Sequence, residues 1–177
     1  MAESTGVAIL FRAEIPRVPE VAPVIETYRG QAFQMLAPAE LPRLKMPEVE
    51  VLGPADAEDM LALTKLTEPG PYGVRTPELG TYVGVREQGR LVAMAGERFC
   101  WPGFGEISAV CTHPDVRGQG LGAALTIWMA NHIVGRGDAA FLHVVSDNTS
   151  AKALYERLGF TVRRTVEVAV YFPKPNP

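Results

Sequence analysis

The chain is poor in cysteine: its 177 residues include two, Cys100 and Cys111, with neither a redox nor a metal-ligand spacing. This scarcity argues against a disulfide framework, so we expect a reducing, cytoplasmic location and two buried thiols. Long hydrophobic runs are missing too, since none approaches the ~18 apolar residues of a membrane span. The short apolar segment Val7–Phe11 lacks the basic start of a signal peptide. We therefore expect a soluble protein without membrane contacts.

An excess of positive charge is also absent, because 17 Lys and Arg face 20 Asp and Glu, for a net charge of −3. Nucleic-acid surfaces need clustered basic residues to neutralise phosphates, so we expect no nucleic-acid partner, although a local basic pocket stays open. The three histidines are not spaced as ligands, which predicts no metal. What is present, 47% hydrophobic residues, suffices for one compact domain with a core.

Prolines punctuate the first 47 residues. Proline removes a backbone donor and restrains its neighbour, so the one long regular element expected there is Val24–Leu36. We treat residues 1–47 as an N-terminal extension that packs over the main domain, extends the substrate site or forms an arm. Residues 48–177 are expected to form the main domain.

From Val49 onward, hydrophobic periodicity and turn residues predict alternating elements. The expected strands are Val49–Leu52, Thr81–Arg86, Leu91–Phe99, Phe104–Thr112, Ala139–Val145 and Phe160–Phe172, and the expected helices are Ala57–Leu66, Leu121–Val134 and Thr149–Leu158. This order predicts an α/β (α+β) fold with a mixed sheet and helices on both faces.

A glycine-rich turn, VRGQGLG at residues 116–122, joins an expected strand to an expected helix. The unpaired N–H groups of a helix N-terminus suit a phosphate, and glycines let an anion approach them. A turn serving strand–helix packing alone is the open alternative. A Walker loop is excluded because no Lys-Ser/Thr follows, and a dinucleotide fingerprint fits poorly because Asp138 precedes the next strand.

A second motif, SDNTSAKALYERLGF, occupies residues 146–160. Asn148, Ala151 and Tyr155 share one face of the expected helix. The Tyr155 hydroxyl could protonate a leaving thiolate, or Tyr155 could be a core residue with its hydroxyl at the rim.

Together, Arg117-x-x-Gly120-x-Gly122 and Asn148-x-x-Ala151-x-x-x-Tyr155-x-x-Leu158-Gly159-Phe160 resemble the signature of the GCN5-related N-acetyltransferase (GNAT) superfamily. The segment GEISAVCTHPDVRGQGLG resembles its FR47-like branch. The resemblance covers residues 49 to 172 and implies a mostly antiparallel central sheet. It also implies acetyl-CoA or a short acyl-CoA as co-substrate.

The resemblance assigns roles to both motifs. The strand before the turn would bulge and bind the pantetheine arm through its backbone, the turn would hold the pyrophosphate, and Tyr155 would act as general acid. The implied CoA-binding residues are Val110, Cys111, Thr112, Arg117, Gly118, Gln119, Gly120, Leu121, Gly122, Ala123, Asn148 and Ala151.

Glu106 is the expected proton acceptor. By strand alternation, Glu106, Ser108, Val110 and Thr112 should share one face, and a carboxylate inside a sheet strand is costly without a function or a partner. Superfamily members that use a glutamate base show a similar spacing to the turn. The alternative is a structural carboxylate bonded to a neighbouring loop.

The acceptor is less well marked. Tyr72 and Arg75, in the loop after the first helix, are candidate substrate contacts, with Arg75 suited to a carboxylate. A small-molecule amine or amino acid is favoured over a protein or peptide amine, and a homodimer is conceivable by analogy. A non-catalytic acyl-CoA sensor and a nucleotide-dependent oxidoreductase are the competing classes.

Overall fold

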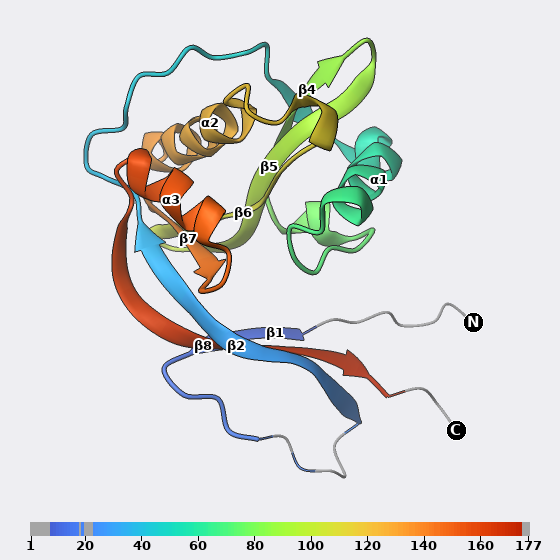
Figure 1. Ribbon diagram of the computed structural model, residues 1–177, viewed down its shortest axis with the longest axis vertical. Coiled ribbons are helices and arrows are strands. Elements are labelled where there is room, and N and C mark those ends of the chain that lie inside the picture. The colour runs from blue at the N-terminus through green and yellow to red at the C-terminus, as the bar shows by residue number, and fades with distance from the viewer. Residues whose placement is uncertain (1–7, 18, 20–22, 175–177) are drawn as a thin grey trace.

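The computed structural model describes residues 8–17, 19 and 23–174 (Figure 1). Within these residues, eight strands form one sheet in the order β1-β8-β2-β7-β6-β5-β4-β3. The strands are β1 Ala8–Arg12, β2 Val24–Leu36, β3 Glu50–Leu52, β4 Tyr82–Glu87, β5 Arg90–Trp101, β6 Phe104–Thr112, β7 Ala139–Val145 and β8 Thr161–Pro173. The α-helices are α1 Ala57–Thr67, α2 Leu121–Gly135 and α3 Thr149–Arg157.

The sheet is mixed and mostly antiparallel, as the sequence predicted. Parallel pairing is confined to β6 and β7, and every other described pair is antiparallel. Helices cover both faces. Leu125 and Met129 of α2 belong to one apolar cluster with Ile107, whereas Met60 of α1 belongs to a second cluster with Cys111.

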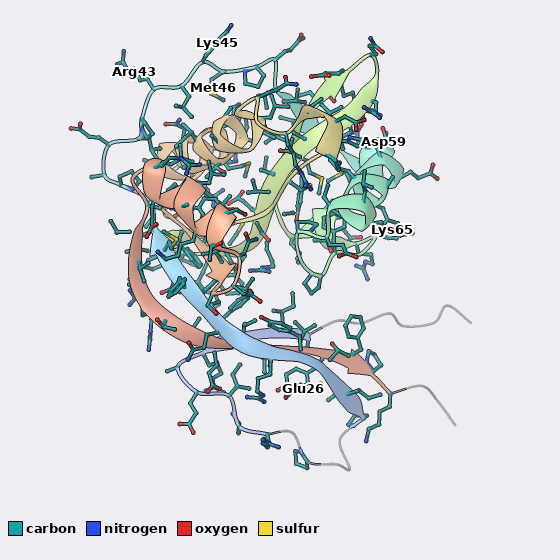
Figure 2. All side chains as sticks on the ribbon, in the orientation of Figure 1. Glu26, Arg43, Lys45, Met46, Asp59 and Lys65 are labelled. Carbon is teal, nitrogen blue, oxygen red and sulfur yellow. The ribbon has the colours of Figure 1, made fainter. Side chains whose placement is uncertain are left out.

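The N-terminal segment supplies an internal strand of this sheet. β2 spans the predicted Val24–Leu36 and pairs with β7 on one side and β8 on the other. Figure 1 shows β2 and β8 continuing past the helices with β1 beside them. We call this three-stranded part, residues 8–12, 24–31 and 167–173, the arm. Figure 2 shows the connection from β2 to β3, with Arg43, Lys45 and Met46 on the outside.

β6 contains a bulge at Ala109, where φ is +52° and the register with β5 shifts. A bulge puts two residues opposite one and so reverses the alternation beyond it. Ile107 and Val110 accordingly both contact the α2 cluster, while Ala109 and Cys111 contact the α1 cluster. The prediction that Glu106 and Val110 share one face is therefore wrong.

The cysteine prediction was half right. Cys111 is buried, and burial raises the pKa of its thiol to about 11. Cys100 is exposed, because it lies near the end of β5 where the strand leaves the core. In the part of the chain that the structure describes, no helix has the length and apolar character needed to cross a membrane.

Candidate active site

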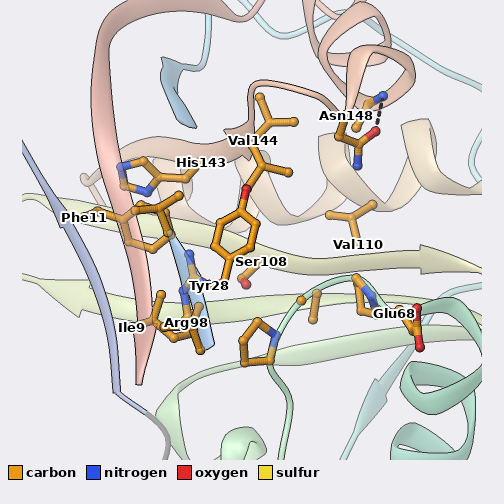
Figure 3. Close-up of a pocket in the computed structure, with 18 of the residues that line it drawn as sticks. Ile9, Phe11, Tyr28, Glu68, Arg98, Ser108, Val110, His143, Val144 and Asn148 are labelled. Carbon is orange, nitrogen blue, oxygen red and sulfur yellow. Dashed lines mark hydrogen bonds between the residues drawn. The ribbon is translucent and has the colours of Figure 1, made fainter. Parts of the chain in front are cut away.

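A cavity of about 470 Å³ opens where β6 and β7 separate, between the arm and the loop after α1 (Figure 3). β6 and β7 pair from Phe104–Ala139 to Ile107–Leu142 and then diverge. The side chains around the cavity come from the arm, β5, β6, β7, α3 and the loop after α1. They include Ile9, Phe11, Tyr28, Glu68, Arg98, Ser108, Val110, His143, Asp147, Asn148, Ala151, Tyr155, Val168, Val170 and Phe172.

The divergence leaves an edge of β6 without a strand partner. Within the described residues, Ser108 to Thr112 pair with β5 but not with β7. Exposed backbone N–H and C=O groups on such an edge are a template for an extended ligand. The predicted residues Val110, Cys111 and Thr112 lie here, with the Cys111 side chain turned to α1.

The glycine turn lies against the end of this edge. A Cβ built on Gly122 would contact Thr112 Oγ1 at 3.6 Å and Val110 Cγ1 at 3.8 Å. Gly118 and Gly120 have φ near +80°, which glycine adopts without strain. Among the described residues, no protein acceptor is bonded to the backbone N–H groups of residues 118–123. These groups and the N-terminus of α2 are suited to an anion.

The remaining members of the turn are arranged around those groups. Arg117 is exposed and its Nε donates to the carbonyl of Thr112 at 3.3 Å, which holds the guanidinium beside the turn. Gln119 is exposed, and Leu121 is buried in the core as the first residue of α2. Ala123 packs partly against the same core.

Asn148 and Ala151 form the start of α3 at the cavity. Asn148 is the N-cap, and its Oδ1 accepts from the N–H of Ala151 and from Ser150 Oγ, both at 3.1 Å. The bond from the Ala151 N–H, drawn in Figure 3, is a typical helix cap. The Asn148 amide nitrogen remains as a donor toward a ligand.

Tyr155 lies about two helical turns after Asn148 on the same face of α3. It is buried, yet it lines the cavity. Its hydroxyl has no hydrogen-bond partner among the described residues. Burial raises the pKa of Tyr155 to about 12, so the phenol stays protonated at neutral pH. This position is compatible with both predictions for Tyr155, a general acid beside the ligand and a core residue with its hydroxyl at the rim.

Glu106 is buried on the opposite face of the sheet from Val110, in a polar cluster that the sequence did not reveal. Its Oε1 accepts from Arg98 Nη2 of β5 and lies 2.9 Å from His143 Nδ1 of β7. Glu106 does not itself line the cavity, but Arg98 and His143 do.

The cluster keeps Glu106 ionised. Burial alone would raise the pKa of this carboxyl, but the hydrogen bond from His143 and the charge of Arg98 outweigh it and lower the pKa. The other His143 nitrogen, Nε2, lies 3.3 Å from Gln34 Nε2, a geometry that fits a proton on Nδ1 donated to Glu106.

The two predicted acceptor contacts do not reach the cavity. Tyr72 packs edge-on against Tyr82 beneath α1, at 6.1 Å between ring centroids. Arg75 is exposed and paired with Glu78 at 2.7 Å. Neither therefore supports recognition of an acceptor carboxylate. Across the described residues, no cluster of three or more His, Cys, Asp or Glu could hold a metal ion.

Sequence reasoning missed the arm side of the cavity. Ile9, Phe11 and Tyr28 line it from the segment set apart as an extension. Phe11 stacks on His143 with ring centroids 4.0 Å apart, and Arg98 lies over the Phe11 ring at 4.9 Å. No motif marks these residues. The available signal was the strand-like length of Val24–Leu36.

Comparison with known proteins identifies relatives of the fold. A family model described as FR47-like protein matches residues 82–169. A GNAT-family acetyltransferase from Novosphingobium aromaticivorans DSM 12444 has a crystal structure similar to this chain. The two share 35% sequence identity and superpose with a TM-score of 0.86. That match covers 97% of this chain and 76% of the solved chain. A GNAT-family acetyltransferase from Colwellia psychrerythraea shares the fold at 16% identity and a TM-score of 0.67, covering 83% of this chain and 58% of the other.

Curated relatives match over shorter stretches. The mycothiol acetyltransferase of Streptomyces coelicolor is 45% identical over 63 residues, which are 35% of this chain and 20% of that protein. The mycothiol acetyltransferase of Thermomonospora curvata is 36% identical over 98 residues, 55% of this chain and 32% of that protein. The chain thus spans no more than about a third of the length of these relatives.

Proposed function

The chain belongs to the GNAT superfamily of acetyltransferases, and from this premise we propose that it transfers an acetyl or short acyl group from acyl-CoA to a primary amine of a small molecule. The observation that carries the proposal is the unpaired edge of β6 at Ser108–Thr112, which ends at the unbonded N–H groups of residues 118–123. A strand edge followed by an anion site suits a ligand with an amide-containing arm and a pyrophosphate.

Acyl-CoA would supply the acyl group as a thioester. In our proposal, residues 118–123 and Arg117 bind the pyrophosphate, and the backbone of Val110–Thr112 pairs with the pantetheine amides. The Asn148 amide nitrogen donates to the same arm, and Ala151 leaves room for it because its side chain is a single methyl group.

Tyr155 is proposed as the general acid. As the amine nitrogen bonds to the carbonyl carbon and the C–S bond breaks, the departing sulfur gains a negative charge. A protonated phenol at the cavity wall can neutralise that charge by donating its proton. The raised pKa of Tyr155 supports this role, because the hydroxyl stays protonated until it is needed.

Glu106 is proposed to accept the proton of the attacking amine through water. Its lowered pKa keeps it charged, so it can attract a proton without being protonated at rest. Because the bulge turns Glu106 away from Val110, the base and the acid approach the reacting centre from opposite faces of the sheet.

Tyr155→Phe tests the proposal, with Tyr82→Phe as the matched control. Both tyrosines are buried, but the Tyr82 hydroxyl lies outside the cavity and has no hydrogen-bond partner among the described residues. We expect Tyr155→Phe to lower kcat by about 100-fold with unchanged CoA affinity, and Tyr82→Phe to leave both unchanged. Acetylated amine is measured by mass spectrometry and CoA binding by calorimetry. CoA binding without turnover of any amine would favour a sensor, and absence of CoA binding would refute the proposal.

A further inference from the structure

The arm gives the cavity an apolar wall built from two rows of cross-strand neighbours. In one row Phe11 and Gly30 flank Val168, and in the next Ile9 and Tyr28 flank Val170. All but Gly30 line the cavity. Residues directly opposite each other on neighbouring strands present one continuous surface.

Gly30 makes room for the Tyr28 ring in this wall. A Cβ on Gly30 would lie 2.6 Å from the Tyr28 hydroxyl, so the hydroxyl end of the ring lies over the glycine. Figure 3 shows the Tyr28 ring extending into the cavity between Val144 and Arg98. The wall is therefore aromatic and aliphatic over its whole described extent, apart from the hydroxyls of Thr27 and Tyr28.

The charges around the cavity disfavour an anionic acceptor. Arg98 is the one Lys or Arg among the described lining residues, and its charge is neutralised by Glu106 while Phe11 covers its face. Two exposed carboxylates, Glu68 and Asp147, stand at the rim. A substrate carboxylate would meet like charges there without a free cation inside, whereas an ammonium group would be attracted.

The wall also lies largely outside the residues that the family model matches. The family model begins at residue 82, so β1 and β2 are not part of the match. The donor side of the cavity comes from the matched region, through Val110, Asn148 and Tyr155. The arm is therefore the part of the cavity that the family model does not specify.

From this juxtaposition we propose that the acceptor is a primary amine on an apolar, aromatic or branched alkyl body without a carboxylate, bound against the arm between Phe11 and Tyr28. This inference rests on the proposed acetyl transfer and narrows its substrate class. Free amino acids and small polyhydroxylated amines are excluded by it.

The test compares 2-phenylethylamine with ethanolamine, L-phenylalanine and L-phenylalaninamide, using acetyl-CoA and the full chain. We expect kcat/KM for 2-phenylethylamine to exceed that for ethanolamine and L-phenylalanine by at least about tenfold. Phenylalaninamide, in which the carboxylate is masked, should approach 2-phenylethylamine. Product is measured by mass spectrometry, because the exposed Cys100 would react with thiol reagents.

Two variants link this preference to the wall. Ile9→Thr keeps a β-branched strand residue and should raise KM for 2-phenylethylamine about fivefold while leaving ethanolamine and CoA affinity unchanged. Leu10→Thr is the control, since Leu10 is exposed on the other face of β1. Thermal melting verifies that both variants are folded.

The outcomes separate this inference from the proposed function. Absence of CoA binding would overturn both the apolar-acceptor assignment and the proposed acetyl transfer. CoA binding with ethanolamine or L-phenylalanine acetylated as well as 2-phenylethylamine overturns the apolar-acceptor assignment and leaves acetyl transfer standing. CoA binding with none of the four amines acetylated also overturns the assignment.

Discussion

At the scale of single residues, the proposed chemistry depends on two buried side chains with opposite pKa shifts. Tyr155 is kept protonated by burial, and Glu106 is kept ionised against burial by His143 and Arg98. Environments that separate an acid from a base in this way are characteristic of sites that move protons.

Glu106→Gln should lower kcat by about 100-fold, because the amide cannot accept a proton. Glu97→Gln is the matched control. Glu97 is equally buried and forms an ion pair with Arg136 at 2.5 Å, but it does not line the cavity. Turnover per folded molecule is measured for both variants. Equal losses of kcat in Glu106→Gln and Glu97→Gln would mean that Glu106 affects turnover only by stabilising the fold.

The same residue predicts a pH dependence of stability. Because the pKa of folded Glu106 lies below its ordinary value of 4.5, its stabilising contribution is present above that value and is lost as the pH falls through the folded pKa. In urea unfolding, Glu106→Gln should cost about 2 kcal/mol near neutral pH and less in acid. A difference in the free energy of unfolding between the unmodified protein and Glu106→Gln that does not change with pH would contradict this prediction. The exposed Glu78→Gln should cost at most about 0.5 kcal/mol.

At the scale of elements, the bulge in β6 decides how the site is built. Ala109 holds a left-handed backbone conformation, which glycine adopts without strain and β-branched residues adopt poorly. Ala109→Gly should change the free energy of unfolding by less than about 1 kcal/mol, whereas Ala109→Val should cost about 1–3 kcal/mol and weaken CoA binding. Denaturant unfolding and calorimetry measure the two effects. Unchanged CoA affinity in Ala109→Val would show that the bulge is not needed for the donor site.

The turn before α2 gives a second prediction at this scale. Gly120 is the left-handed N-cap of α2, and Gly135 lies at the other end of the helix in open space. Gly120→Ala should weaken CoA binding by about tenfold, because a side chain disfavours the conformation that directs the N–H groups outward. Gly135→Ala should have no effect on binding. Equal affinities in the two variants would argue against an anion site at the turn.

At the scale of the whole molecule, the N-terminal segment is bound into the sheet. β2 lies between β7 and β8, and its Ala32 and Met35 are fully buried. Deleting residues 1–37 would expose two strand edges and part of the core, so we expect no folded monomer by circular dichroism and size exclusion. Deleting residues 1–13 removes the edge strand β1 and should leave a folded, CoA-binding protein with slower turnover of apolar amines. A folded fragment 38–177 that binds CoA would instead support residues 1–47 as a separate extension.

The sequence by itself determined the elements from β3 onward and the two motifs that we propose bind the acyl donor. Gly120 forms a left-handed turn and Asn148 caps a helix. Both are local features that a few neighbouring residues determine. The mostly antiparallel sheet followed from the resemblance that these motifs carry.

The tertiary structure alone decided the side of the cavity that we propose binds the acceptor. The resemblance implied a bulge in β6, but strand alternation did not place it, so only the structure showed that the faces of β6 reverse at Ala109. Phe11, Arg98 and His143 meet from three strands far apart in the chain, and such contacts are set by strand order, which short-range periodicity does not contain.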